Sequence, residues 1–114
     1  MLDAKLQLKP GQSIAVTGGP ERLDLAAPRS DAGAAGAVLV FVRNRADLEQ
    51  YVGDLKAGAD ADRLTWVAYP KAGRLGTDLN RDVVREMAAA HGLDTVRQVA
   101  VDAMWSALRL KSAP

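Results

Sequence analysis

The chain has 114 residues, of which 48% are hydrophobic and 25% charged, and 15 Lys and Arg against 14 Asp and Glu leave a net charge of +1. This length supports one modest core, so residues 1–114 are predicted to form a single α/β domain; the near-zero charge excludes the strong positive field that drives nonspecific nucleic-acid binding. The absence of Cys and the single His exclude disulfides, thiol nucleophiles and a zinc site.

The start of the chain gives the expected location. Residues 1–8 alternate charged and apolar side chains and lack the continuous apolar stretch of a secretory signal. No segment approaches the roughly 20 apolar residues that a membrane span needs. We therefore expect a cytoplasmic protein of bacterial type that does not insert into a membrane.

The first strand is predicted at residues 13–17, after the turn pair Pro10-Gly11. Residues 18–36 are rich in Gly, Ala, Pro, Ser and Asp and are predicted to be mostly irregular, with a short strand at residues 23–25. Residues 37–42 form a continuous apolar run rich in β-branched side chains. Such a run is typical of a parallel strand that is covered on both faces.

A helix is predicted next, because Asn44 can cap it with Asp47 at its third position, and Gly58 is predicted to close it. One buried stripe is formed by Leu48, Tyr51, Val52 and Leu55. A strand at residues 64–69 follows and ends at Pro70.

The second helix is predicted to be capped by Thr77 or Asp78, with Gly92 just past its end. Strands at residues 95–102 and 105–110 are separated by only two residues, which predicts an antiparallel hairpin. Right-handed crossovers make the sheet parallel from residue 37 onward, with the last strand reversed. The predicted fold is thus a small, mostly parallel sheet with flanking helices and a C-terminal antiparallel hairpin.

This order of elements resembles the second half of the class I methyltransferase fold, which implies a truncated Rossmann-like, methyltransferase-like topology. Such enzymes hold S-adenosylmethionine with a Gly-rich loop after their first strand. Here the Thr17-Gly18-Gly19-Pro20 loop lacks that spacing, and too few residues follow it to complete the pocket. No cofactor is therefore predicted.

Four local segments carry a second resemblance, which runs from residue 8 to residue 110. They read WVAYPK at residues 66–71, TDLNRD at 77–82, VRQVAVD at 96–102 and WSALR at 105–109. They resemble a family of small bacterial proteins of unknown function, which implies no activity.

Ligands of such sheets favour the crevice at the carboxyl ends of the strands, where the loops at residues 17–22, 43–45, 71–78 and 102–105 collect. Glycines in the first loop can bring backbone N–H groups to a phosphate, or can simply form a turn. Basic side chains in the next two loops can close over an anion at the second helix, or can be solvated charges. Asp78 at that helix end weakens the anion hypothesis, because its carboxylate would already satisfy the positive dipole.

The last loop adds Asp102, which can act as a general base or merely cap the turn, and Trp105, which can stack on a ring or cover the edge of the core. No paired acid or nucleophile lies at a catalytic spacing, so no catalytic and no metal-binding residue is predicted. The candidate ligand-binding residues are Gly18, Gly19, Arg43, Lys71, Arg74, Thr77, Asp102 and Trp105.

Two functions from different classes remain open. The preferred interpretation is a non-catalytic binding or protein-interaction module, with a protein partner or with homodimerisation through the first strand or the exposed sheet edge. The alternative is a small enzyme or nucleotide-binding protein that holds an anionic metabolite with Arg43, Lys71 and Arg74 and uses Asp102 for proton transfer. Whether the protein is an enzyme is left open.

Overall fold

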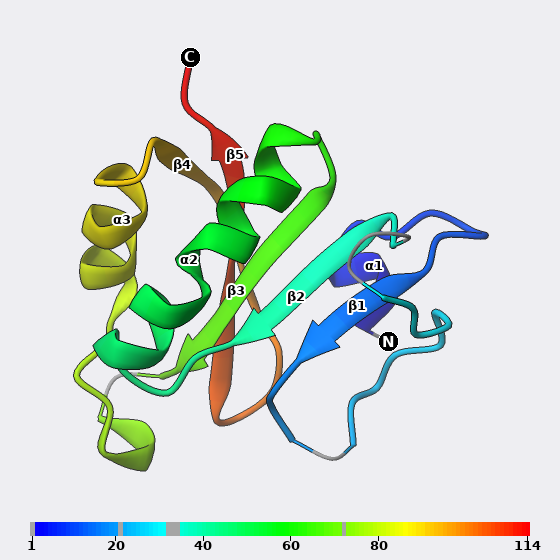
Figure 1. Cartoon of the computed structure of the whole chain (residues 1–114). Coiled ribbons are helices and arrows are strands. Elements are labelled where there is room, and N and C mark those ends of the chain that lie inside the picture. Colours follow the sequence, from blue (N-terminus) through cyan, green and yellow to red (C-terminus); the bar gives the residue numbers. More distant parts are fainter. Residues whose placement is uncertain (1, 21, 32–34, 72) are drawn as a thin grey trace.

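A computed structural model describes residues 2–20, 22–31, 35–71 and 73–114, and its strands form one five-stranded sheet (Figure 1). The elements in chain order are α1 Leu2–Lys5, β1 Ile14–Thr17, β2 Ala37–Phe41, α2 Arg45–Asp60, β3 Leu64–Pro70, the 3₁₀ turn η1 Arg74–Gly76, α3 Arg81–Ala89, β4 Leu93–Ala100 and β5 Trp105–Ser112. Within these described ranges, none of the helices is both long and apolar enough to cross a bilayer.

The strand order is β1-β2-β3-β5-β4, and it makes the sheet mixed. β2 pairs in parallel with β1 and with β3, whereas β5 is antiparallel to both of its neighbours. The prediction of a mostly parallel sheet is therefore wrong, because half of the four pairings are antiparallel. The C-terminal antiparallel hairpin is confirmed.

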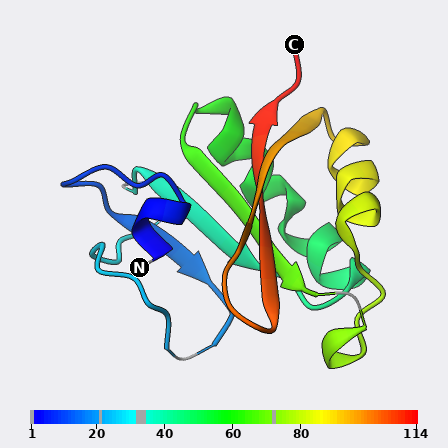
Figure 2. The same cartoon turned by 180° about the vertical axis from the view of Figure 1, so that it is seen from behind.

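Two apolar layers cover the sheet, and they differ in kind (Figures 1 and 2). On one face α2 and α3 pack on alternate strand residues, in a cluster that includes Val38, Val40, Val42, Leu48, Leu55, Val67 and Val84. On the other face the short helix α1 and an irregular segment cover a cluster that includes Leu2, Leu6, Leu39, Phe41, Trp66 and Ala107.

This layering overturns the expected truncated Rossmann-like, methyltransferase-like topology. That architecture places helices on both faces of a parallel sheet. Here the second face carries only the four-residue α1. The chain between β1 and β2 forms neither a helix nor a strand in its described residues, so the short strand predicted at residues 23–25 is also absent.

A few specific hydrogen bonds fix the N-terminal segment to the irregular segment between β1 and β2 and to the sheet. The Asp3 carboxylate accepts from the backbone N–H groups of Ala26 and Ala27, each at 2.9 Å. The buried Trp66 indole donates to the Leu6 carbonyl oxygen over 3.1 Å. Side-chain contacts thus replace the crossover helix that this face lacks.

The helix boundaries confirm two of the predicted helix ends, at Asn44 and Gly92, and correct the other two. Asn44 caps α2, as expected, by accepting from the Asp47 N–H at 2.9 Å. Gly58 does not end α2, which continues to Asp60; Gly58 is buried, and a Cβ there would lie 2.8 Å from the Thr65 hydroxyl oxygen. Glycine is needed at this position because helix and strand approach closely, and Asp62 makes the left-handed turn with a φ of 60°.

The cap of α3 is Asn80, and neither Thr77 nor Asp78 takes that position. The Asn80 side chain accepts from the Val83 N–H at 2.9 Å, while the Thr77 hydroxyl accepts from the Leu79 N–H before the helix begins. Gly92 follows the helix end with a φ of 75°, as expected.

The predicted strand at residues 95–102 begins and ends two residues earlier, as β4. Its connection to β5 therefore spans residues 101–104, where a two-residue turn was predicted. Asp102 makes the longer turn possible, because its Oδ1 accepts from the N–H groups of Met104 and Trp105 at 2.7 and 2.9 Å.

The indole of Trp66 gives the first testable prediction. Trp66→Phe removes the donor and leaves the buried Leu6 carbonyl without its partner, which costs about 1–3 kcal/mol beyond the effect of the smaller ring. Trp105→Phe is the matched control, because Trp105 is also buried but its indole N–H has no hydrogen bond within the described residues. Urea denaturation of both variants measures the difference, and equal losses would contradict the assigned role of the hydrogen bond.

Candidate functional site

The candidate residues follow the strand ends that meet at one edge of the sheet, here called the rim. β1, β2 and β3 all end there, and the antiparallel β5 begins there, since Pro70 pairs with Trp105. The backbone N–H of Lys71 donates to the Met104 carbonyl oxygen at 2.8 Å, which ties the loop after β3 to the β4–β5 turn. This edge lies at the bottom of Figure 1.

Four of the eight candidates line one cavity of about 460 Å³, here called the rim cavity. It lies between the loop after β1, the end of β2, the first turns of α2 and the start of β5. Its lining residues are Gly18, Gly19, Pro20, Phe41, Arg43, Asp47, Gln50, Tyr51 and Trp105.

Two aromatic rings form one wall of the rim cavity. The Phe41 and Trp105 rings meet edge to face, with centroids 5.0 Å apart and an interplanar angle of 84°. Both side chains are buried, and the Asp102 carboxylate fixes the backbone at Trp105. The hydrogen bonds of Asp102 favour its turn-capping interpretation, because one oxygen is committed to two backbone donors.

Residues 18 and 19 are glycines because the backbone packs closely on Phe41 at these positions. Gly18 and Gly19 have φ values of 70° and 86°, in the left-handed region that favours glycine. A Cβ on Gly19 would lie 2.5 Å from the Phe41 ring, and one on Gly18 would lie 3.3 Å from the Phe41 carbonyl oxygen. These contacts give the pair a structural reason to be glycine, independent of any bound phosphate.

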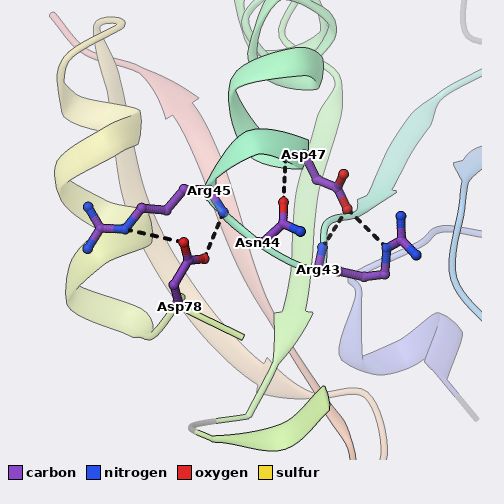
Figure 3. Close-up of polar contacts among 5 residues, drawn as sticks. All are labelled: Arg43, Asn44, Arg45, Asp47 and Asp78. Atoms are coloured by element: carbon purple, nitrogen blue, oxygen red, sulfur yellow. Dashed lines mark hydrogen bonds and ion pairs between the residues drawn. The ribbon is translucent and has the colours of Figure 1, made fainter. Parts of the chain in front are cut away.

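Carboxylates already occupy the N-terminus of α2, beside the rim cavity (Figure 3). Asp47 accepts from the Arg43 backbone N–H at 3.0 Å and from the Arg43 Nε at 3.2 Å. From the other side, Asp78 accepts from the Arg45 N–H at 2.9 Å. The N–H groups of Arg45 and Asp47 at this helix end thus have partners within the protein, in Asp78 and Asn44, and both carboxylates lie near the positive end of the helix dipole.

These contacts also settle the ionisation of Asp47. The backbone N–H of Arg43 lowers the pKa of the Asp47 carboxyl, the Arg43 side chain lowers it further, and partial desolvation opposes both. Asp47 is therefore a carboxylate at neutral pH, and its charge offsets that of Arg43.

The remaining candidates lie at the rim but outside this cavity. Lys71 lines a separate cavity of about 370 Å³ with Tyr69 and Asn80. Arg74 belongs to the exposed turn η1, and the Thr77 hydroxyl is committed to the Leu79 N–H. The predicted grouping of Lys71, Arg74 and Arg43 around a single anion is therefore not assembled in the structure.

Sequence reasoning did not select five residues that line the rim cavity: Pro20, Phe41, Asp47, Gln50 and Tyr51. Tyr51 was assigned to the buried stripe of the helix, and Asp47 only to its cap. Their place in the sequence could have indicated them. Asp47, Gln50 and Tyr51 occupy one side of the first two helical turns, directly after a buried strand. No three His, Cys, Asp or Glu side chains in the described ranges come together as a metal site.

Comparison with known proteins places the chain in a family without assigning it an activity. The chain belongs to the family described as "Protein of unknown function (DUF3052)", whose model matches residues 21–113. Among curated proteins, no significant match is found.

Gly19→Ala tests the packing on Phe41. We expect a loss of about 2–4 kcal/mol, because the methyl group adds a clash with the ring to the strain of a positive φ. Gly11→Ala is the matched control: its φ of 85° is nearly the same, but nothing lies within 4 Å of its Cβ, so only the backbone strain of about 1–2 kcal/mol remains. Chemical denaturation compares the two, and equal losses would show that the Phe41 contact costs nothing.

The pKa of Asp47 gives a prediction with a defined sign. The folded pKa of Asp47 lies below the ordinary aspartate value of 3.8, so its contribution to stability is present above that value and is lost as the pH falls through the folded pKa. In Arg43→Ala the pKa should stay low, because the largest cause is the backbone N–H, which the variant keeps. NMR titration of the carboxyl measures it, and a return to 3.8 in the variant would instead make the guanidinium the main cause.

Proposed function

We propose that this member of the DUF3052 family is a non-catalytic binding module that holds a small uncharged or zwitterionic ligand in the rim cavity. The cavity itself is the observation that carries the proposal. Its volume of about 460 Å³ falls within the range of roughly 300–1,000 Å³ that is typical of small-molecule sites. It also combines aromatic surface with a few polar groups, the usual lining of such sites.

The charge of the lining supports an uncharged or zwitterionic ligand. Among the described residues that line the cavity, the charged side chains are Arg43 and Asp47, and they pair with each other at 3.2 Å. An anion would have to compete with the Asp47 carboxylate for the guanidinium. A zwitterion can instead engage both, and Gln50 offers an amide donor and acceptor at the same wall.

The state of the two nearby carboxylates supports binding without catalysis. A general base needs a free lone pair and a pKa near the working pH. The pKa of Asp47 is lowered instead, and Asp102 holds the β4–β5 turn. Asp47 is therefore not poised as a base near neutral pH, and Asp102 has a structural role in the turn.

The alternative of an anionic-metabolite enzyme at the rim has less support. Its proposed basic residues divide between the rim cavity, which holds Arg43, and a second cavity, which holds Lys71. Arg74 lines neither of these two cavities. The rim cavity could instead accept a side chain of a protein partner. An experiment should distinguish this occupant from a small ligand.

A thermal-shift panel tests the proposal. Nucleosides and aromatic amino acids are compared with their phosphorylated forms, and we expect the unphosphorylated compounds to raise the melting midpoint at least as much. A ligand at about 100 times its Kd adds roughly 2.7 kcal/mol, which is a shift of many degrees in a domain of this size.

Two tryptophan variants of α2 locate the response. Gln50→Trp places a bulky ring at an exposed position of the cavity wall and should abolish the shift. Ala46→Trp puts the same ring on an exposed position of the same helix outside the rim cavity lining, and should preserve it. A shift that survives Gln50→Trp, or a panel in which nothing binds while a protein partner does, would contradict the proposal.

A further inference from the structure

A second polar cavity, here called the basal cavity, lies at the edge of the sheet opposite the rim. It has a volume of about 390 Å³ and is bounded by Gly36 and Leu64, at the amino ends of β2 and β3. Its polar lining comes from Gln7, Lys9, Gln12, Asp62, Arg109 and Lys111.

Both glutamines present donors to this cavity, because their amide oxygens are already used. Gln7 Oε1 accepts from Arg109 Nη1 at 2.7 Å, and Gln12 Oε1 accepts from the Lys9 backbone N–H at 2.8 Å. Each side chain therefore keeps its NH₂ group for another partner. Within residues 2–20 and the other described ranges, no hydrogen bond engages either NH₂ group.

Arg109 is incompletely satisfied by the protein. Its Nε is buried and has no hydrogen-bond partner, which is costly for a charged donor. The residue directly opposite it on β4 is Arg97, and like charges at directly opposed positions of a sheet repel. An anion beside the Arg109 guanidinium would offset this repulsion and the uncompensated charge.

The charge balance of the basal cavity is positive. Lys9, Arg109 and Lys111 line it against the single carboxylate of Asp62. Asp94 lies opposite Lys111 in the strand register, but no ion pair joins them in the described part of the chain. This cavity differs from the rim cavity, where the cation and the carboxylate are paired.

We propose that the basal cavity binds the phosphate group of a small phosphorylated compound. Five side chains offer donors to it, more than the two oxygens of a carboxylate ligand can readily engage. A phosphate monoester presents three acceptor oxygens and a charge of roughly −1.5 to −2, which suits the positive lining. The proposal is independent of the rim cavity, which lies at the other end of the strands.

The test titrates the full chain with inorganic phosphate and with glycerol 3-phosphate, with glycerol as the control, and follows the backbone amides by NMR. We expect shifts at residues 7–12, 36, 62–64 and 109–111 with both phosphates and none with glycerol. Lys111→Gln, at an exposed position, should weaken binding about ten-fold, as the loss of one charge-assisted hydrogen bond implies. Arg109→Gln should weaken it more.

Arg85→Gln is the matched control, because Arg85 is an exposed cation on α3, over the other face of the sheet, and should leave the affinity unchanged. Lys111→Gln keeps the test valid if Arg109→Gln unfolds the protein. Equal weakening by the Arg85 and Lys111 variants would reveal only a general charge effect and would overturn the proposal. Binding of a single-stranded oligonucleotide but not of the small phosphates would also overturn the proposal, as would the absence of chemical-shift changes at millimolar phosphate.

The Gln50→Trp variant separates this proposal from that of the rim cavity. It should bind phosphate normally, so each proposal can fail without the other.

Discussion

The structure depends on the burial of β2 and β3 on both faces at once. All five residues of β2 are buried, and six of the seven in β3 are buried as well. Alternate side chains point to opposite faces, so Val38 and Val40 need the helical layer while Leu39 and Phe41 need a second cover. Among the described residues, the stretch before β2 supplies the helix α1 and the irregular segment of that cover. The helix α1, the Asp3 hydrogen bonds and the Trp66 indole are therefore needed to hold the cover on the second face of the sheet.

That constraint also shapes the rim. Because Phe41 is buried in the second layer, the chain leaving β1 must pass directly over its ring, and two glycines with positive φ make this approach possible. The next residues after Phe41 turn into α2, whose first N–H groups would be left unsatisfied without partners. Asn44 and Asp78 are the partners of the Asp47 and Arg45 N–H groups, while the Asp47 carboxylate accepts from the Arg43 N–H just before the helix. The hollow between the glycine turn and the helix is therefore a product of the same packing that completes the core.

The sequence predicted the parts of the fold that depend on local pattern. The apolar run of β2, the Asn44 cap and the C-terminal hairpin each carry their signal within a few residues, and each was found. The cap of α3 was misplaced because Thr77, Asp78 and Asn80 are all good capping residues, and only the contact between Asp78 and Arg45 decides among them. The mixed character of the sheet and the N-terminal cover depend on contacts between residues far apart in the chain, such as Trp66 with Leu6. Of the eight candidate residues, Gly18, Gly19, Arg43 and Trp105 line one cavity, and their role in binding a ligand stays a prediction. The sequence could not show that Arg43 is paired with Asp47.

The two edges of the sheet differ in charge for a reason that lies in α2. The N-terminus of this helix points to the rim, where its positive dipole end favours carboxylates, and the carboxylates that gather there neutralise the nearby arginines. Its C-terminal end lies toward the basal edge, since Asp62 follows the helix directly and lines the basal cavity. Asp60 at that end pairs with Lys56, and among the described residues no ion pair joins an acid to Lys9, Arg109 or Lys111. One helix orientation thus accounts for a rim that suits an uncharged ligand and a basal edge that suits an anion.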